Sequence, residues 1–156
     1  MNVISLLTPK AQVAYIYDDC TIRQGLEKLR AHGYTAVPVL ARDGRYVGTV
    51  SEGDFLWNIL DGNDNSLRAK EKQPLRQIVR PGFNPAVRID ITMPELLDRA
   101  IQQSFIPVVD DRGAFVGIVT RQTVIRCLAV PAADSPQEVL FHRPCRTGAV
   151  AAAVPD

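Results

Sequence analysis

The sequence predicts an α+β fold in which two copies of one β-α-β-β-α unit pack sheet to sheet around a pseudo-two-fold axis. The first observation is an internal repeat: residues 36–51 match residues 105–120 without a gap, at an offset of 69. A match at one fixed offset indicates a tandem duplication. The second observation is that a single copy, with only three strands, cannot bury both faces of its sheet. A second copy packed against the first would bury the remaining face.

The composition is that of an ordinary globular protein. Of the 156 residues, 46% are hydrophobic and 22% are charged, and the formal net charge is +1. These values exclude collagen-like, coiled-coil and wholly disordered chains. A net charge close to zero gives no excess of basic residues that would bind nucleic acid or a membrane surface, so we expect neither partner.

Targeting and metal signals are weak. No apolar run approaches the roughly 20 residues of a membrane helix. The first residues carry no basic region and no cleavage site, so we expect a cytoplasmic protein. Cys20, Cys127 and Cys145 are odd in number and widely spaced, and only two histidines accompany them. The sequence therefore predicts no metal site and no disulfide framework.

Each copy begins with a short extended stretch, residues 13–17 in the first and 86–89 in the second, and continues into a helix. The spacings Thr21-x-x-Gln24 and Thr92-x-x-Glu95 are capping boxes, in which side chains satisfy the free N–H groups of the first helical turn. Gly33 follows the first helix and is typical of a helix end.

The second half of each copy is predicted to be a β-hairpin followed by a helix. In the first copy, strands 36–40 and 46–50 are joined by a turn that contains Asp43-Gly44, a hairpin signal. The final helix is predicted to begin at Ser51, and its equivalent at Thr120. The predicted organisation is a first repeat at 3–61, a polar linker at 62–73, a second repeat at 74–129 and a poorly ordered tail at 130–156.

Several of these motifs resemble the cystathionine-β-synthase (CBS) domain, and two such domains in tandem resemble a Bateman module. The motifs are Leu6-Leu7-Thr8-Pro9, the run Gly33-Tyr34-Thr35-Ala36-Val37-Pro38-Val39, the spacing Gly48-x-x-Ser51-x-x-Asp54, and their partners at 78–81, 105–109 and 117–120. The resemblance implies the β-α-β-β-α fold, adenine nucleotides bound in two clefts between the repeats, and a regulatory role. With no catalytic domain attached, the chain looks like a stand-alone CBS pair.

A narrower resemblance is to the small cyclic-di-AMP-binding CBS proteins of Gram-positive bacteria. It is carried by residues 33–38, by Val13-Ala14 and by Thr120-Arg121. It implies a first cleft in which Ala14, Thr35 and Ala36 contact the adenine and Arg121 contacts a phosphate. The full set of expected contacts is Gln12, Val13, Ala14, Thr35, Ala36, Thr120, Arg121 and Gln122. Gln12 and Gln122 stand where that subgroup has Lys and Arg, which leaves a mononucleotide as the alternative ligand.

Ser51 and Asp54 mark a second cleft. In the functional interpretation, Asp54 accepts hydrogen bonds from both ribose hydroxyls while Ser51 approaches the phosphate. The alternative is a capping box that stabilises the helix and binds nothing. The second copy has Thr123 where Asp54 would map and Phe105 in the place of Ala36. The two clefts are therefore not equivalent.

The residues show no catalytic constellation. Glu52 and Asp54 have no neighbouring histidine, and the glycines form no phosphate-binding loop. We expect a non-enzymatic regulatory protein that binds an adenine nucleotide, cyclic di-AMP first and AMP, ADP or ATP second. It would need no cofactor, would form a homodimer through exposed helix faces, and would signal to an unidentified partner protein. A ligand-free interaction module and a nucleotide hydrolase are the other classes left open.

Overall fold

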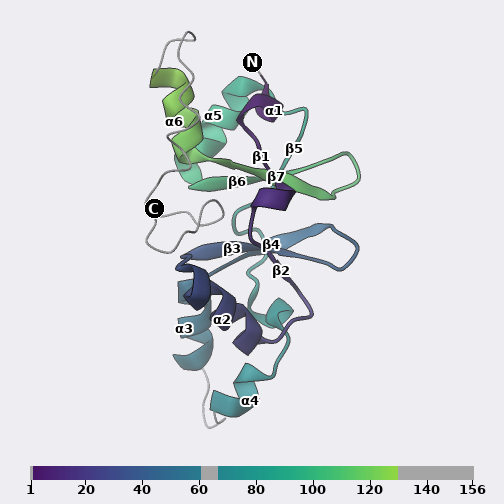
Figure 1. The fold of residues 1–156 in the computed structure, drawn as a ribbon, viewed down its shortest axis with the longest axis vertical. Helices are drawn as coiled ribbons and strands as arrows, with labels where there is room; N and C mark the ends of the chain where they lie inside the picture. Colours follow the sequence, from purple (N-terminus) through teal and green to yellow (C-terminus); the bar gives the residue numbers. More distant parts are fainter. Residues whose placement is uncertain (1, 61–66, 130–156) are drawn as a thin grey trace.

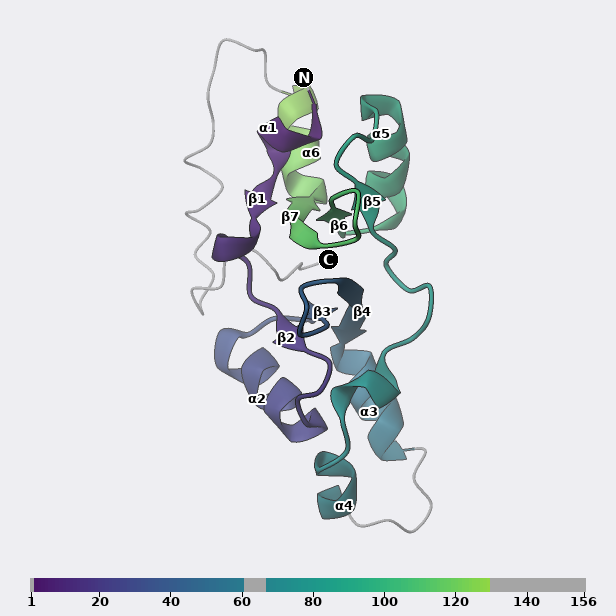
Figure 2. The same ribbon diagram turned by 90° about the vertical axis from the view of Figure 1, so that its right-hand side faces the viewer.

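The computed structural model describes residues 2–60 and 67–129, and its two β-sheets face each other with helices on their outer sides (Figures 1 and 2). One sheet has three strands in the order β2-β3-β4, and the other has four in the order β1-β7-β6-β5. This arrangement confirms the predicted α+β fold of two repeats packed sheet to sheet.

The elements follow the same order in the two repeats. The first contains β2 (Ile16–Tyr17), α2 (Ile22–His32), β3 (Ala36–Leu40), β4 (Tyr46–Ser51) and α3 (Glu52–Leu60). The second contains β5 (Val87–Arg88), α5 (Met93–Gln102), β6 (Phe105–Val109), β7 (Phe115–Thr120) and α6 (Arg121–Ala129). Among the described residues, no helix has both the length and the apolar character that crossing a bilayer requires.

Local chemistry explains the helix boundaries. The Thr21 hydroxyl accepts a hydrogen bond from the Gln24 N–H at 3.1 Å, and the Gln24 side chain accepts one from the Thr21 N–H at 2.9 Å. Thr92 and Glu95 form the same reciprocal pair at the start of α5. Gly33 closes α2 at φ 71°, a left-handed conformation that glycine adopts without strain. Both predicted capping boxes and the predicted helix end are confirmed.

The two hairpins share one register. Ala36 lies opposite Ser51 in the first, and Phe105 lies opposite Thr120 in the second. Each hairpin also has a register irregularity at the equivalent place, after Val39 and after Val108. The hairpin ends therefore bring the starts of α3 and α6 to the same side of the molecule (Figure 1).

The N-terminal segment crosses to the other repeat. Helix α1 (Val3–Leu6) and strand β1 (Thr8–Pro9) come before β2 in the chain, yet Thr8 pairs antiparallel with Ile118 of β7. Val3 and Leu6 are buried in the hydrophobic cluster of the second repeat. Residues 3–9, which the sequence groups with the first repeat, thus complete the sheet of the second, because their apolar side chains find a buried surface there.

The segment that leads into the second repeat crosses in the opposite direction. Residues 75–78 form a single 3₁₀ turn, and Leu75 and Ile78 are buried in the cluster that contains the first repeat. The Leu75 N–H donates to the Cys20 carbonyl at 2.7 Å. Each repeat is therefore completed by the segment that leads into the other repeat. This exchange of leading segments holds the two repeats together by packing.

The predicted linker contains a short helix, α4 (Leu67–Glu71). Lys70 in this helix is buried, and its ammonium donates to the Asn58 and Ile59 carbonyls at 2.6 and 3.3 Å. A cation at this place satisfies the last carbonyls of α3, which have no partner within the helix. The rest of the linker up to residue 66 and the predicted tail at 130–156 lie outside the described residues.

The core between the repeats is apolar and aromatic. Phe105, Phe115 and Ile118 of the second repeat lie in one cluster with the buried residues of the first. The Tyr46 and Phe115 rings stack with centroids 6.2 Å apart. The hairpin tips are joined as well, because the Phe115 N–H donates to the Gly44 carbonyl at 2.9 Å. This shared core fixes how the two clefts are placed.

Candidate functional site

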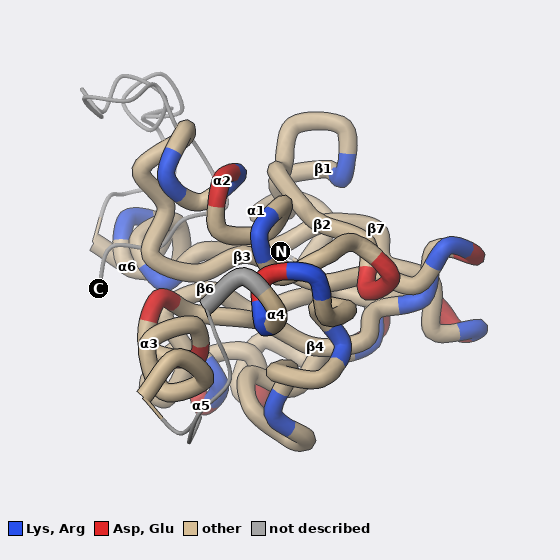
Figure 3. Tube along the Cα trace, turned by 90° about the horizontal axis from the view of Figure 1, so that it is seen from below, with Lys and Arg blue, Asp and Glu red and all other residues tan. Residues whose placement is uncertain are grey.

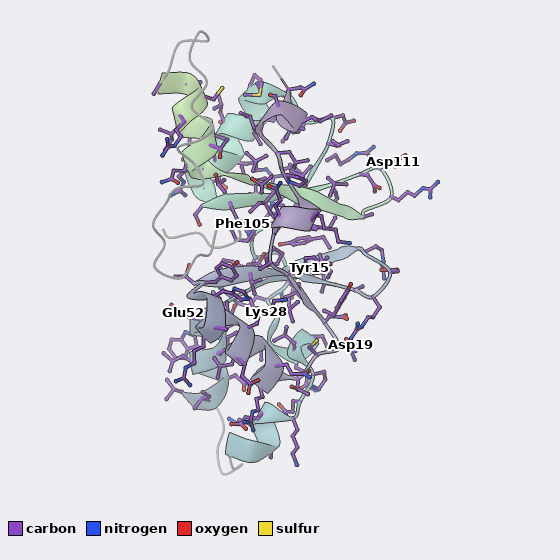
Figure 4. All side chains as sticks on the ribbon, in the orientation of Figure 1. Tyr15, Asp19, Lys28, Glu52, Phe105 and Asp111 are labelled. Carbon is purple, nitrogen blue, oxygen red and sulfur yellow. The ribbon has the colours of Figure 1, made fainter. Side chains whose placement is uncertain are left out.

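The residues predicted for the first cleft lie at the edge of the shared core. Ala14 and Ala36 are half-buried against it, and Val13 is buried within it. Gln12, Thr35 and Gln122 are exposed. Figure 4 shows Tyr15 and Phe105 in the layer between the two sheets.

Arg121 is engaged with the protein. It is the first residue of α6, as predicted, but its Nε donates to the Ala100 carbonyl at 2.7 Å and its Nη2 donates to the Ile101 carbonyl at 3.4 Å. The guanidinium thus caps the C-terminal end of α5. Thr120 caps α6, because its hydroxyl accepts from the Thr123 N–H at 3.1 Å. A phosphate contact by Arg121 would require its side chain to leave these carbonyls.

Two cations that the sequence analysis did not select lie beside the first cleft. The ammonium groups of Lys10 and Lys28 lie 5.3 and 5.9 Å from the centroid of the Tyr15 ring. Lys28 also donates to the Tyr15 carbonyl at 2.8 Å. Tyr15 directly follows Ala14, so these lysines bring positive charge to the region where Gln12 supplies none. The sequence position of Lys28 gives no sign of this, because the residue lies 13 positions beyond Tyr15, in α2.

Asp54 is the centre of the second cleft. Its side chain is 5% exposed, and its Oδ2 accepts from the Ser51 N–H at 2.8 Å and from the Ser51 hydroxyl at 3.1 Å. Its Oδ1 forms a salt bridge with Arg80 Nε at 2.7 Å. Asp54 thus reaches back to the Ser51 N–H as in one half of a capping box, and the same two residues also line a pocket.

This pocket, the Asp54 pocket, has a volume of about 450 Å³. That volume lies in the range of about 300–1,000 Å³ that small-molecule sites occupy. It lies between the start of α3 and the leading segment of the second repeat, and its lining residues are Ser51, Gly53, Asp54, Trp57, Asn58, Gln77, Ile78 and Arg80. The Asn58 Oδ1 is buried and accepts no hydrogen bond from any described residue. It is a polar atom ready to bind a donor on a ligand.

Arg80 was missed at the level of sequence, although a signal was present. In the repeat alignment, Leu6-Leu7-Thr8-Pro9 matches Ile78-Val79-Arg80-Pro81, so Arg80 replaces a threonine in an otherwise similar motif. The guanidinium also lies 3.9 Å from the centroid of the Phe83 ring. A cation is thereby held in the lining of the Asp54 pocket.

A second pocket, of about 520 Å³, adjoins a polar network between the repeats. The Asn84 amide donates to the Thr49 hydroxyl at 3.2 Å and accepts from the Gln103 amide at 2.8 Å. The Tyr46 hydroxyl donates to the Asn84 carbonyl at 2.7 Å. Burial raises the pKa of Tyr46 well above its usual range, so the phenol stays neutral and keeps this proton.

Charge and metal chemistry are unremarkable elsewhere in the described part of the chain. Basic and acidic positions are interspersed along the trace (Figure 3), in keeping with the net charge of +1. Among the described residues, no three His, Cys, Asp or Glu side chains gather where they could hold a metal ion. Neither Cys20 nor Cys127 forms a disulfide within those residues, and Cys145 lies outside them.

Comparison with known proteins shows to which family the chain is similar. The model of the CBS domain matches residues 4–61 and 75–130. A curated relative, the homoserine O-acetyltransferase of Methanohalophilus mahii, is 30% identical over 112 residues, which cover 72% of this chain. The match spans only 22% of that enzyme, so the enzyme's activity does not transfer with it.

Solved structures agree with the fold. The structure of CbpB in complex with c-di-AMP superposes with a TM-score of 0.77 at 22% identity, covering 82% of this chain and 84% of that one. The structure of CBSX2 in complex with AMP has a TM-score of 0.68 at 22% identity, covering 81% and 95%. At this identity, the likeness shows the shared fold alone.

Proposed function

Because the chain belongs to the CBS-domain family and carries two CBS domains in tandem, we propose that it is a non-enzymatic regulatory protein that binds an adenine nucleotide between its repeats. The observation that carries the proposal is the Asp54 pocket, where Ser51, Asp54 and Arg80 come together at the start of α3.

The pocket offers the groups that a ribose phosphate requires. A buried carboxylate such as Asp54 accepts hydrogen bonds from two vicinal hydroxyls, and Arg80 can bind a phosphate through two N–H groups. The N-terminus of α3, a nine-residue helix, adds the positive end of its dipole. These features favour a mononucleotide, AMP, ADP or ATP, and CBSX2 is a protein of the same fold whose structure holds AMP.

Cyclic di-AMP in the first cleft is the second candidate. The similarity to CbpB, a protein of this fold in complex with c-di-AMP, favours it. The small side chains of Ala14 and Ala36 leave room for a base beside the backbone, and Lys10 and Lys28 add positive charge nearby. In this case, Arg121 would exchange the α5 carbonyls for a phosphate.

Thermal-shift measurements with AMP, ADP, ATP, cyclic di-AMP and, as a control, cyclic di-GMP test both candidates. A ligand at a hundredfold excess over its Kd adds about 2.7 kcal/mol of stability. We expect Asp54→Asn to abolish the shift with AMP, and Arg121→Ala to abolish any shift with cyclic di-AMP. If no adenine nucleotide shifts the melting temperature, the proposal is wrong and the chain is a ligand-free interaction module.

We further propose that a second copy of the chain covers the outer helix faces. Leu56, Trp57 and Leu60 on α3 and Ile125 and Leu128 on α6 are each more than half exposed. The two helices lie on the same side of the molecule (Figure 1). A patch of this kind is typical of an interaction surface. Sedimentation velocity should show a dimer that Leu60→Glu dissociates, and a wild-type monomer at micromolar concentration would contradict this.

A nucleotide-dependent change at the clefts would then reach a partner protein. The ligand need only bind one arrangement of the repeats better than another to shift their populations. Because the Asp54 pocket lies between α3 and the segment that leads into the second repeat, an occupied pocket contacts both repeats.

A further inference from the structure

Both carboxylate oxygens of Asp54 already have partners within the protein. Its Oδ2 is held by Ser51, and its Oδ1 is held by Arg80 Nε at 2.7 Å. Arg80 is the one cation in the described part of the chain that forms an ion pair with Asp54. The pair is asymmetric, because the carboxylate is 5% exposed while the Arg80 side chain is 53% exposed.

Arg80 can move more readily than Asp54. Its second contact is the face of the Phe83 ring, which orients the guanidinium but offers it no hydrogen bond. Asp54 is fixed at the start of α3 by two hydrogen bonds from Ser51. When a ligand enters the pocket, the carboxylate therefore stays in place and the guanidinium is the group that gives way.

A ribose diol that approaches Asp54 Oδ1 competes with Arg80 Nε for this oxygen. A nucleoside provides hydroxyls that replace Arg80 on the carboxylate, but it gives the displaced guanidinium no anion. A nucleotide provides both, since its phosphate accepts two N–H groups from the same arginine. With a nucleotide bound, the Asp54 carboxylate binds the ribose hydroxyls and the Arg80 guanidinium binds the phosphate, so that both groups of the ion pair have a new partner.

We propose that Arg80 is a specificity-determining residue, which makes ribose binding at Asp54 depend on phosphate binding in the same pocket. The pocket then selects phosphorylated adenosines and rejects adenosine itself. This inference rests on the proposed function, and it adds which class of ligand the pocket admits and which residue decides it.

Calorimetric titration of AMP and adenosine tests the inference on the wild type and on Arg80→Ala. A hydrogen bond to a charged group is worth about a 10- to 100-fold change in affinity, so we expect wild type to favour AMP over adenosine by about 100-fold. In Arg80→Ala, AMP binding should weaken and adenosine binding should strengthen, so that the two Kd values come within about fivefold.

Arg76→Ala is the matched control, because it removes the same charge from an exposed arginine that lies 4.0 Å from Asp18, outside the pocket lining. Arg76→Ala should leave the ratio of the Kd values for adenosine and AMP as it is in wild type. Arg80→Gln replaces Arg80→Ala if the latter does not fold. If AMP weakens in the Arg80 variant while adenosine stays as weak as in wild type, Arg80 is a phosphate contact only and the inference is overturned. A wild type that binds neither ligand would overturn the assignment of the Asp54 pocket to a mononucleotide, and this inference with it.

Discussion

Replacing Asn84 tests whether the polar network between the repeats holds the leading segment of the second repeat in place. Asn84 is the one non-glycine residue in the described part of the chain with a positive φ, at 57°. Its side chain donates to the Thr49 hydroxyl at 3.2 Å and accepts from the Gln103 amide at 2.8 Å. The side chain and the backbone therefore contribute separately, and two substitutions can separate them.

The expected magnitudes follow from these contacts. Asn84→Ala removes two hydrogen bonds, at about 1 kcal/mol each, and places an alanine in the left-handed region, at about 1 kcal/mol more. The free energy of unfolding should fall by about 3 kcal/mol. Asn84→Gly removes the same two bonds without that strain, so the loss should be about 2 kcal/mol. Glycine should be the milder replacement, although it offers no side chain at all.

Urea unfolding followed by far-ultraviolet circular dichroism measures both values, provided that the m-value is unchanged. Gln102→Ala is the control, since Gln102 lines the same pocket and is exposed. We expect that variant to stay within about 0.5 kcal/mol of wild type. If Asn84→Gly is less stable than Asn84→Ala, or if both match wild type within that margin, the account of the network is wrong.

Two further predictions concern the second repeat. Gly117→Ala would place a methyl group against the Thr8 carbonyl, part of the backbone of β1, so we expect a loss of about 2–4 kcal/mol in urea unfolding. Gly53→Ala, in α3, would bring a methyl group to an ordinary contact distance of 3.7 Å from the Ser51 hydroxyl and should cost nothing. Equal values for the two variants would refute the clash. The hydrogen bond from the Thr92 hydroxyl holds the pKa of Glu95 below its usual range. The ionised Glu95 side chain therefore stabilises the fold fully above about pH 4.3, the usual pKa of a glutamate, and this stabilisation is lost as the pH falls through the lowered pKa of Glu95 in the folded protein. In Glu95→Gln, the melting temperature should fall less steeply than in wild type as the pH drops below about 4.3. The same fall in both proteins would contradict the role given to Glu95.

The sequence predicts the repeated part of the fold well, because its signals are local. Capping boxes at Thr21 and Thr92, the left-handed Gly33 and the two hairpins depend on neighbouring residues, and each occurs where the repeat places it. The duplication strengthens these predictions, since each motif is observed twice.

The exchange of leading segments could not be predicted in the same way. Val3 and Leu6 are apolar, but nothing local indicates that they bury against the second repeat and not the first. Lys70 shows the same limit, since a lysine in a polar stretch gives no sign that it is buried on the carbonyls at the end of α3. Both outcomes depend on tertiary packing.

The candidate site was predicted in part. Ser51 and Asp54 lie together and line a pocket, whereas Arg121 is bound to the carbonyls at the end of α5. Arg80 lies 26 positions beyond Asp54 in the chain and reaches it because the segment around Ile78 packs on the first repeat. Pairings of this kind follow from topology, which a motif does not contain.

Calorimetric titration of AMP into wild type, Asp54→Asn and Arg121→Ala tests the central claim most directly. The account predicts one AMP bound per chain, an affinity that falls at least about tenfold in Asp54→Asn, and no change in Arg121→Ala. Binding of AMP that is unaffected by Asp54→Asn, or no heat with any adenine nucleotide, would contradict the assignment of the Asp54 pocket as the nucleotide site.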